Sequence, residues 1–390
     1  IINRLKPQAN TAHIHLGNLT GQFLDDTVHD RDIPFAQSMT RYFQMNALEM
    51  LACEGFQSQQ QAEAFYEKAR AQRANIRKLI GQDLRQSIAR YDSAHVTLEP
   101  TFFSDMLGIQ GRLDFLYRHK KQTIIIEQKS GKGDFVPPSS PSYDPEVPKP
   151  QEKHLVQLLL YRALLTYEFN LHSEELSHIM LLYSRYQQGL VSVGQMPALM
   201  LRAIRMRNLL AWCEIHHAQE GYAFLSTLSP EKLNRKQVGG ILWNIYVRPE
   251  LERLLLPIHQ ASSLERAYFL RFMQFLAQER LLSKVGSKTK EDAGFASKWL
   301  SSLEEKRAAG NIYEGLILDD FQQDDDGVTG LMARFPQQQS ADTSNFRRGD
   351  IVLLYPYKEH TEPRVCAQMV IRGSIEDIST EGIRLTLRNG

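Results

Sequence analysis

Apolar residues recur with helical spacing over most of the first 95 positions, with polar residues between them. A helical stretch is predicted to begin at Asp32, with an apolar stripe formed by Met39, Tyr42, Phe43, Leu48 and Leu51. A second long helix is predicted from Gln57 to Arg90. Its expected inward residues are Phe65, Ala69, Ile76 and Leu79. Many Gln, Arg and Lys residues occupy the outer face, which fits either a solvated helix or contact with DNA.

The pattern changes to short apolar runs between residues 93 and 186, and these runs are rich in β-branched and aromatic residues. Strands are predicted at Val96–Phe103, Ile109–Arg118, Gln122–Lys129 and His178–Tyr186. A helix is predicted over residues 151–169, before the last strand. Strands mixed with a helix in this order favour an α/β layer.

A polar segment between Gly131 and Gln151 contains six prolines, which rules out a regular element across it. A loop of this length inside a compact domain is usually functional or disordered. Because it directly follows the predicted strand that ends at Lys129, we favour a flap at the mouth of a cleft, with plain disorder as the alternative.

Helical spacing returns between residues 194 and 310, and after Gly310 short strands separated by turn residues are predicted. These strands are Ile312–Leu318, Gly330–Phe335, Asp350–Tyr355, Arg364–Arg372 and Gly382–Arg388. Their spacing is typical of a small β-barrel. We therefore predict three domains, with boundaries at 1–193, 194–310 and 311–390.

Composition adds little to this picture. Hydrophobic content of 42% and charged content of 23% are typical of a soluble globular protein, and the net charge of +1 does not by itself indicate nucleic-acid binding. No apolar run approaches the roughly 18–20 residues needed to cross a bilayer. The first residues do not resemble a signal peptide and lack an initiator methionine, so we expect a piece excised from a longer protein.

The three cysteines, Cys53, Cys213 and Cys366, lie far apart and form no Cys-x-x-Cys motif. This distribution argues against a disulfide framework and favours a reducing cytoplasm, with nucleoid association if the protein is bacterial. Cys53 is interpreted as a buried apolar thiol.

The candidate chemistry lies in two of the predicted strands, in Gly-Arg-Leu-Asp (111–114) and Ile-Ile-Ile-Glu-Gln-Lys (124–129). Side chains alternate faces along a strand, so Glu127 and Lys129 are expected on the same side. If the two strands pair as a hairpin, Asp114 reaches that side too. Carboxylates are ligands that Mg²⁺ prefers, and a nearby ammonium can orient water or neutralise a phosphate oxygen. The backbone carbonyl of Gln128 is a candidate further ligand.

These segments resemble the PD-(D/E)XK nucleases, specifically the RecB-like branch fused to superfamily 1 DNA helicases in replication helicase-nucleases. That branch carries a Gly-x-x-Asp strand, an (Asp/Glu)-x-Lys strand and a helix with Gln-x-x-x-Tyr. The third motif is present as Gln157-Leu-Leu-Leu-Tyr161, whose two polar residues share one helical face. The resemblance covers most of the chain, but it is specific in motif only over about residues 108–165.

The resemblance implies a restriction-endonuclease-like α/β core with helical N-terminal and connector regions and a C-terminal barrel like that of these helicases. It implies Asp114, Glu127, Lys129, Gln157 and Tyr161 as catalytic residues, with Mg²⁺ or Mn²⁺ as cofactor. Relatives often take a further metal ligand from a Gly-x-x-x-His pattern in the opening helix. Here Gly21 is followed at that spacing by Asp25, and Asp26 and His29 are weaker candidates.

Several relatives hold an iron–sulfur cluster with four cysteines, and three scattered cysteines are too few, so no cluster is expected. The implied function is hydrolysis of single-stranded or branched DNA in replication or repair, with helicase motor domains as partners in the full-length chain and no membrane association. Two alternatives stay open: a non-catalytic DNA-binding or scaffolding domain with the same fold, and a nuclease acting on RNA, since nothing in the sequence reads the 2′-hydroxyl.

Overall fold

The computed structural model describes residues 10–29, 31–88, 91–169, 171, 175–287, 294–324, 327–336, 344–358, 361–366 and 368–387. The chain divides into two compact units. One unit includes Asn10–Ala203 and Lys298–Gly390, and the other includes Ile204–Ser297. All candidate site residues belong to the first unit.

The core of the first unit is a five-stranded mixed sheet with the strand order β1-β4-β5-β6-β7. These strands are β1 Val96–Leu98, β4 Phe115–His119, β5 Gln122–Lys129, β6 Leu176–Tyr183 and β7 Leu190–Ser192. Only β5 and β6 pair in parallel, and helix α7 (Glu152–Glu168) makes the crossover between them. The sheet and helix bear out the predicted α/β core, while β7 has no counterpart in the sequence prediction.

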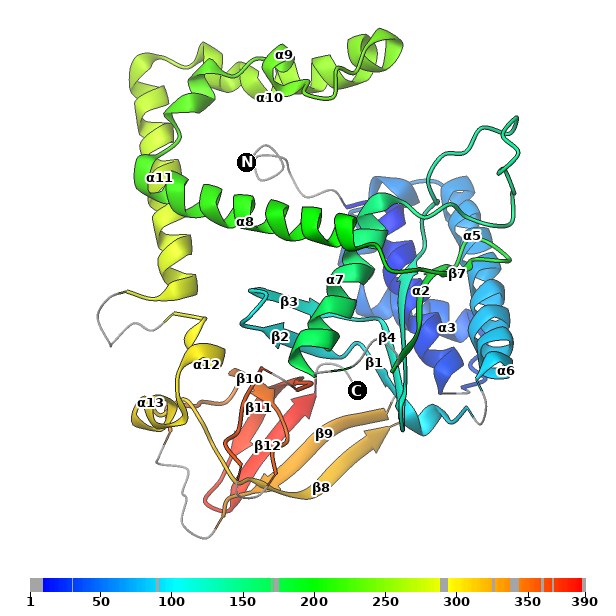
Figure 1. The fold of residues 1–390 in the computed structure, drawn as a ribbon, viewed down its shortest axis with the longest axis vertical. Coiled ribbons are helices and arrows are strands. Elements are labelled where there is room, and N and C mark those ends of the chain that lie inside the picture. The colour runs from blue at the N-terminus through cyan, green and yellow to red at the C-terminus, as the bar shows by residue number, and fades with distance from the viewer. Residues whose placement is uncertain are drawn as a thin grey trace. The chain divides into compact units, whose positions relative to one another are not determined.

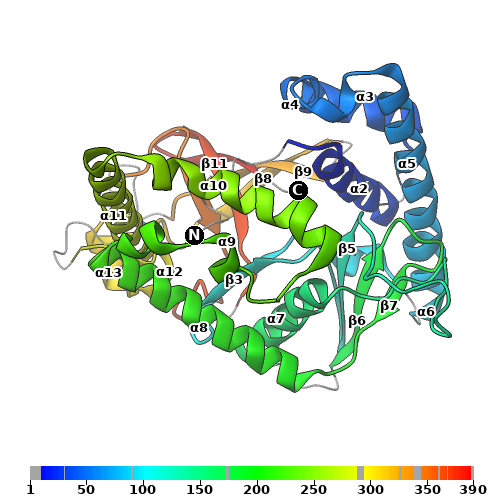
Figure 2. The same cartoon turned by 90° about the horizontal axis from the view of Figure 1, so that it is seen from above.

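Side-chain alternation on the sheet explains why helices cover both of its faces. Ile124 and Ile126 of β5 pack with the N-terminal helices, whereas Ile125 packs with Leu158 and Leu164 of α7. Figures 1 and 2 show the same arrangement, with α7 on one side of the sheet and α2 and α5 on the other. Because β5 is buried on both faces, its run of isoleucines is continuous rather than alternating with polar residues.

The N-terminal helices form the layer on one face of this sheet. They are α2 Ala12–Val28, α3 Phe35–Met45, α4 Ala47–Leu51, η1 Glu54–Phe56, α5 Gln59–Lys78, the π-helical turn η2 Leu79–Leu84 and α6 Arg85–Ser87. The predicted inward residues Phe65, Ala69, Ile76 and Leu79 are all buried. The predicted stripe was wrong in part, because Phe43, Leu48 and Leu51 are 44%, 84% and 71% exposed.

The basic face of α5 is largely engaged with its own neighbours. Arg73 donates a hydrogen bond to the carbonyl of Ile33, and Arg77 pairs with Asp32 at 3.1 Å. Arg85 donates to the carbonyl of Thr27 at 3.1 Å. Arg73 and Arg77 thus fasten α5 to the segment before α3, and Arg85 of α6 fastens that short helix to the end of α2.

The predicted strands Val96–Phe103 and Ile109–Arg118 are present, but each is interrupted in the middle. β1 is followed by β2 (Thr101–Ser104), and β3 (Ile109–Arg112) is followed by β4. The pairs Leu98 with Phe115 and Thr101 with Arg112 keep one continuous register across the interruptions. The two strands are therefore one long hairpin with a kink, in which Glu99-Pro100 lies opposite Leu113-Asp114.

The C-terminal strands do not close into the predicted barrel. They form an open antiparallel sheet with the order β10-β11-β12-β9-β8, so within the described residues β8 and β10 lie at opposite edges. The strands are β8 Ile317–Asp324, β9 Gly327–Arg334, β10 Ile351–Leu354, β11 Ile371–Ile378 and β12 Gly382–Leu387. The strand predicted at Arg364–Arg372 was wrong except at its end, where β11 begins at Ile371. Before that point Val365, Cys366 and Val370 pack against Phe103 of β2 instead of pairing along a ladder.

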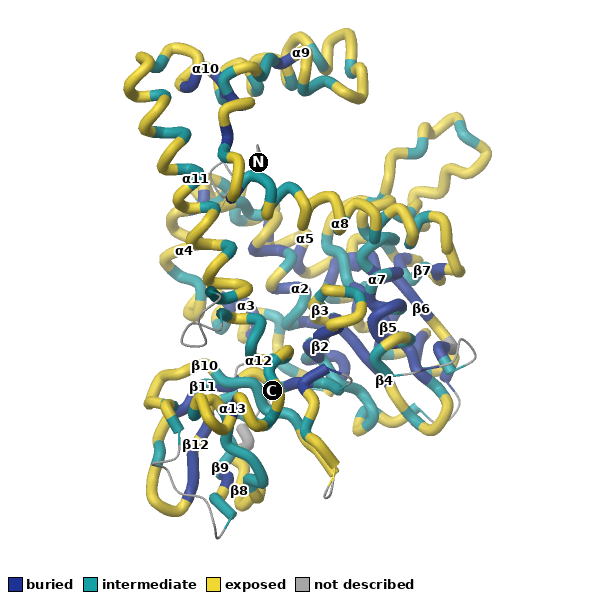
Figure 3. Tube along the Cα trace, turned by 60° about the vertical axis from the view of Figure 1, so that its left-hand side comes forward, coloured by how far each residue is buried: buried dark blue, intermediate teal, exposed yellow. Residues whose placement is uncertain are grey.

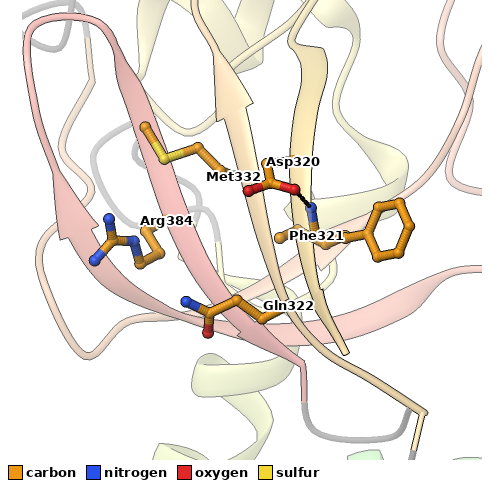
Figure 4. A pocket seen from close by; sticks show the side chains of 6 residues that line it. Asp320, Phe321, Gln322, Met332 and Arg384 are labelled. Carbon is orange, nitrogen blue, oxygen red and sulfur yellow. Dashed lines mark hydrogen bonds between the residues drawn. The ribbon is translucent and has the colours of Figure 1, made fainter. Parts of the chain in front are cut away.

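A small pocket lies on this C-terminal sheet, lined by Asp320, Phe321, Gln322, Leu331, Met332 and Arg384 (Figure 4). The backbone N–H of Phe321 donates to the Asp320 carboxylate at 2.8 Å within it. None of its lining residues is a predicted site residue, and the candidate chemistry lies in the five-stranded mixed sheet.

The second unit is helical. Its elements are most of α8 (Pro197–Glu220), η4 Ala223–Thr227, α9 Pro230–Leu233, the π-helical η5 Leu242–Val247, α10 Arg248–Gln260 and α11 Ser263–Val285. Tyr222, Leu225 and Ile258 form its small core. Most residues along its helices are exposed or only partly buried (Figure 3). The exposed residues include large apolar ones such as Leu264 and Tyr268. No helix among the described residues is long and apolar enough to span a membrane.

Two short helices, α12 Ser297–Leu300 and α13 Leu303–Ala308, precede the C-terminal sheet.

Candidate active site

Asp114 lies in the kink of the hairpin, one residue before β4 begins. Its Oδ2 accepts a hydrogen bond from the backbone N–H of Gln128 at 2.6 Å, which ties the kink to the end of β5. Burial raises the pKa of this carboxyl, while the Gln128 N–H and the charges of Lys129 and Arg112 lower it in part. The predicted approach of Asp114 to the (Asp/Glu)-x-Lys strand is thus present in the structure.

Glu127 follows the three isoleucines of β5 and is only 3% exposed. Its Oε1 accepts hydrogen bonds from Lys129 Nζ at 2.6 Å and from Gln157 Nε2 at 2.5 Å. Its Oε2 is buried and has no hydrogen-bond partner among the described atoms. Burial, and next the negative charge of Asp114, raise the pKa of Glu127 to about 7. A buried carboxylate with one free oxygen beside a second carboxylate is a place where a cation would be stabilised.

Lys129 projects from the same side of β5 as Glu127, as strand alternation predicts. Its backbone carbonyl accepts the N–H of Ser184 at 3.0 Å, at the end of the parallel neighbour β6. The ammonium is therefore at the carboxyl end of a buried strand, with its backbone held by sheet pairing and its side chain partly open to solvent.

Helix α7 brings Gln157 and Tyr161 to the same place. Gln157 Nε2 also lies 3.0 Å from the Tyr161 hydroxyl, and that hydroxyl donates to the carbonyl of Arg112 at 2.7 Å. Burial and the charge of Glu127 raise the pKa of Tyr161 to about 12. A Cβ on Gly111 would lie 2.5 Å from the Tyr161 ring, so the glycine of Gly-Arg-Leu-Asp allows the helix to approach the hairpin this closely.

The tentative ligand Asp25 comes from α2. Burial raises its pKa to about 7, with further contributions from the negative charges of Glu99 and Asp26 and a smaller one from Asp114. Asp26, the next residue of the helix, instead accepts a 3.4 Å hydrogen bond from Ser38 on its carboxylate. The side chain of Gln128 donates to the Thr20 carbonyl at 2.9 Å and so joins β5 to α2.

Whether the site fits a divalent cation rests on its oxygen donors. The free Oε2 of Glu127 and the raised pKa of both Asp114 and Glu127 fit a hard cation at this position. A complete cage is not preformed, because the described residues contain no group of three or more His, Cys, Asp or Glu side chains that could hold a metal. Asp114 and Glu127 would therefore supply only part of a coordination shell.

Two features of the site were missed by the sequence interpretation. Glu99 lies opposite Asp114 in the kink, and its carboxylate pairs with Arg112 at 2.7 Å. Gln72 of α5 is buried and bridges the ends of β5 and β6: it donates to the Ser130 carbonyl at 3.1 Å and accepts from Ser184 Oγ at 2.6 Å. The available sequence signal for Gln72 was its place in the otherwise apolar inward stripe of a long helix.

The sequence matches the PD-(D/E)XK nuclease superfamily over residues 4–239, which is more than half of the chain. The chain therefore belongs to that superfamily, and the five-stranded mixed sheet with its crossover helix is consistent with the superfamily core. Membership suggests a metal-dependent nuclease that acts on nucleic acid. No curated protein matches the sequence.

Proposed function

We propose that this chain is a Mg²⁺- or Mn²⁺-dependent deoxyribonuclease of the RecB-like branch that hydrolyses phosphodiester bonds. The single observation that carries the proposal is the contact of buried Glu127 with both Lys129 and Gln157, beside a second, partly buried carboxylate on Asp114. Charges of this kind are costly to bury. At a scissile phosphate, two carboxylates can hold a cation and a lysine can orient water or a phosphate oxygen.

Each residue has a role that follows from its contacts. Asp114 and Glu127 would hold the cation, with the Gln128 carbonyl and Asp25 as further candidate ligands. The cation would promote formation of the attacking hydroxide and offset charge on the phosphate. Lys129 is placed to orient the attacking water or a phosphate oxygen. Gln157 holds Glu127, and Tyr161 fixes the Arg112 carbonyl two residues before Asp114.

The test is a cleavage assay on end-labelled single-stranded, branched and duplex DNA and on RNA, with Mg²⁺, Mn²⁺ or a chelator. We expect cutting of single-stranded or branched DNA that requires the cation. Asp114→Ala, Glu127→Ala and Lys129→Ala should each abolish cutting with the fold retained, and the carboxylate variants should also lose Mn²⁺ affinity in calorimetry. Lys121→Ala, in the turn between β4 and β5, is the matched control.

The outcomes separate the rival functions. Wild-type-like cutting by Lys129→Ala would refute the proposed site, and binding of DNA without any cutting would favour a scaffolding domain. If the chain cuts RNA in preference to DNA, then RNA takes the place of DNA as the proposed substrate. Gln157→Ala should weaken cutting more than Mn²⁺ affinity, because its amide contacts Glu127 Oε1 and the Tyr161 hydroxyl and leaves Glu127 Oε2 without a partner.

We also propose that the chain works beside helicase motor domains in DNA replication or repair. The exposed apolar side chains of the helical unit, including Leu264 and Tyr268 of α11, support this because such surfaces commonly contact another domain. The sequence offers no phosphate-binding loop with the Gly-Lys-Ser/Thr order, so cutting should proceed without ATP. A strict ATP requirement for cutting would contradict this part of the proposal.

A further inference from the structure

Glu99 has an unusual backbone at the kink of the hairpin. Its φ is 50°, in the left-handed region that non-glycine residues adopt at a cost of about 1 kcal/mol or more. Its N–H donates to the Asp114 carbonyl at 3.2 Å, and the Leu113 N–H donates to the Pro100 carbonyl at 3.2 Å. The hydrogen-bonded ladder thus continues through the kink, and the left-handed backbone conformation that produces the kink is that of Glu99, opposite Asp114.

The side chains around this kink are arranged by the register. Residues directly opposite each other in an antiparallel ladder share a face, and so do residues two apart on one strand. Glu99, Asp114 and Arg112 are therefore expected on one face. Among the described residues the ion-pair partner of Arg112 is Glu99, at 2.7 Å, and not Asp114. The guanidinium is about half exposed, and it is close enough to Asp114 for its positive charge to lower the pKa of that carboxyl, which the proposed function needs for a cation.

We infer that Glu99 is a positioning residue of the candidate metal site: its carboxylate holds Arg112 away from Asp114, while its backbone fixes the kink that carries Asp114. The inference rests on the proposed function. An arginine has five N–H donors and pairs readily with a carboxylate in a bidentate manner. Without Glu99, Arg112 is free to pair with Asp114 and to compete with the cation for its oxygens.

The experiment is a double-mutant cycle measured by Mn²⁺ calorimetry and by the Mn²⁺ dependence of DNA cutting. Glu99→Gln should weaken Mn²⁺ binding about tenfold or more, as loss of a residue that orients a ligand typically does. Arg112→Gln should bind Mn²⁺ within about twofold of the wild type, and Glu99→Gln with Arg112→Gln should return to the Arg112→Gln value. Saturating Mn²⁺ should restore most of the cutting rate of Glu99→Gln, which a merely unfolded fraction would not show.

Glu99→Gly provides a second variant in case Glu99→Gln folds poorly, because glycine adopts the observed φ without strain. It should show the same loss of Mn²⁺ affinity. Unchanged Mn²⁺ affinity in both Glu99 variants, or a double variant no better than Glu99→Gln, would overturn the inference. So would a raised KM for DNA in Arg112→Gln alone, which would assign Arg112 to phosphate contact. If the wild type itself neither binds Mn²⁺ nor cuts, the proposed function fails instead.

Discussion

The two carboxylates of this site, Asp114 and Glu127, are disfavoured in their charged form chiefly by burial. Glu127 has one oxygen occupied by Lys129 and Gln157 and one buried without a partner, and Asp114 is held by a single backbone N–H. Both have a raised pKa, chiefly because they are buried. Buried charges of this kind contribute little to the stability of a fold, and groups with such perturbed pKa values cluster at functional sites, so these carboxylates are best explained by a task at the site.

The sequence predicts some of these residue-level contacts and not others. The alternation of side chains on a strand is enough to place Glu127 beside Lys129, because it needs no knowledge of the rest of the fold. The contact of Gln157 with Glu127 depends on how closely α7 approaches the hairpin, which Gly111 sets. Glu99 was missed because a kink within a strand pattern leaves no periodic signal.

His154, in the first turn of α7, gives a pH-dependent prediction at this scale. Its Nδ1 lies 2.8 Å from the Tyr183 hydroxyl, which also accepts the N–H of Gln151 at 3.0 Å. The Tyr183 hydroxyl can therefore donate its own proton to Nδ1 of a neutral His154 imidazole. Burial, followed by the charges of Lys129 and Lys153, lowers the pKa of His154 to about 4 from an ordinary value of 6.5.

Because the folded pKa is lowered, the unfolded chain binds the proton first as the pH falls. The free energy of unfolding should be unaffected by this group above pH 6.5. It should fall between pH 6.5 and 4, by on the order of 1 kcal/mol once the partial exposure of His154 is considered, and then level off. Urea unfolding of the metal-free protein at several pH values measures this, with His154→Gln as the comparison. The free energy of unfolding of His154→Gln should not show this loss between pH 6.5 and 4. Parallel pH curves for the two proteins would refute it.

At the scale of elements, the regular pieces of the core were predictable and their joints were not. β5 and α7 were predicted almost to the residue, because a continuous apolar run and a helical repeat are local signals. The long hairpin was predicted without its kink. The C-terminal strands were predicted as a closed barrel, but closure depends on pairing between β8 and β10, which are far apart in sequence.

The join between α5 and the ends of β5 and β6 gives a prediction for Gln72. Gln72→Leu would remove the hydrogen-bond partner of the partly buried Ser130 carbonyl and leave the buried Ser184 hydroxyl with only a 3.4 Å contact to the Lys129 carbonyl. Each unsatisfied group typically costs about 1–3 kcal/mol, so the free energy of unfolding should fall by roughly 2 kcal/mol or more. Because Ser130 follows Lys129, DNA cutting should fall as well at a temperature where the protein stays folded.

Gln60→Leu, on the exposed first turn of the same helix, is the matched control and should change stability by less than about 0.5 kcal/mol. Thermal and urea unfolding measure both variants. Equal stabilities for the two would show that the buried amide bridge contributes nothing to holding the end of β5.

At the scale of the whole molecule, the kinked hairpin joins the five-stranded mixed sheet to the C-terminal part of the same unit. Phe102 of β2 packs with Phe169 after α7, whereas the next residue, Phe103, stacks on Trp299 with ring centroids 4.9 Å apart. The N–H of Val370 donates to the Thr101 carbonyl at 3.1 Å, so the segment before β11 adds a bridge to β2. The C-terminal part of this unit is thus built onto the hairpin that carries Asp114.

This arrangement predicts that Phe103→Ala loosens both sides of the contact. Removing a buried aromatic ring typically costs about 3–5 kcal/mol, and the lost stacking partner is Trp299. Amide hydrogen exchange should accelerate in β2 and β3 as well as in the C-terminal sheet, and the Mn²⁺ needed for half-maximal cutting should rise because the kink is less fixed. Phe135→Ala, whose ring is 78% exposed, is the control for loss of a phenylalanine and should leave exchange in the hairpin unchanged. Faster exchange confined to the C-terminal sheet in Phe103→Ala would show that the hairpin is held by α7 alone and that the C-terminal sheet has no influence on the site.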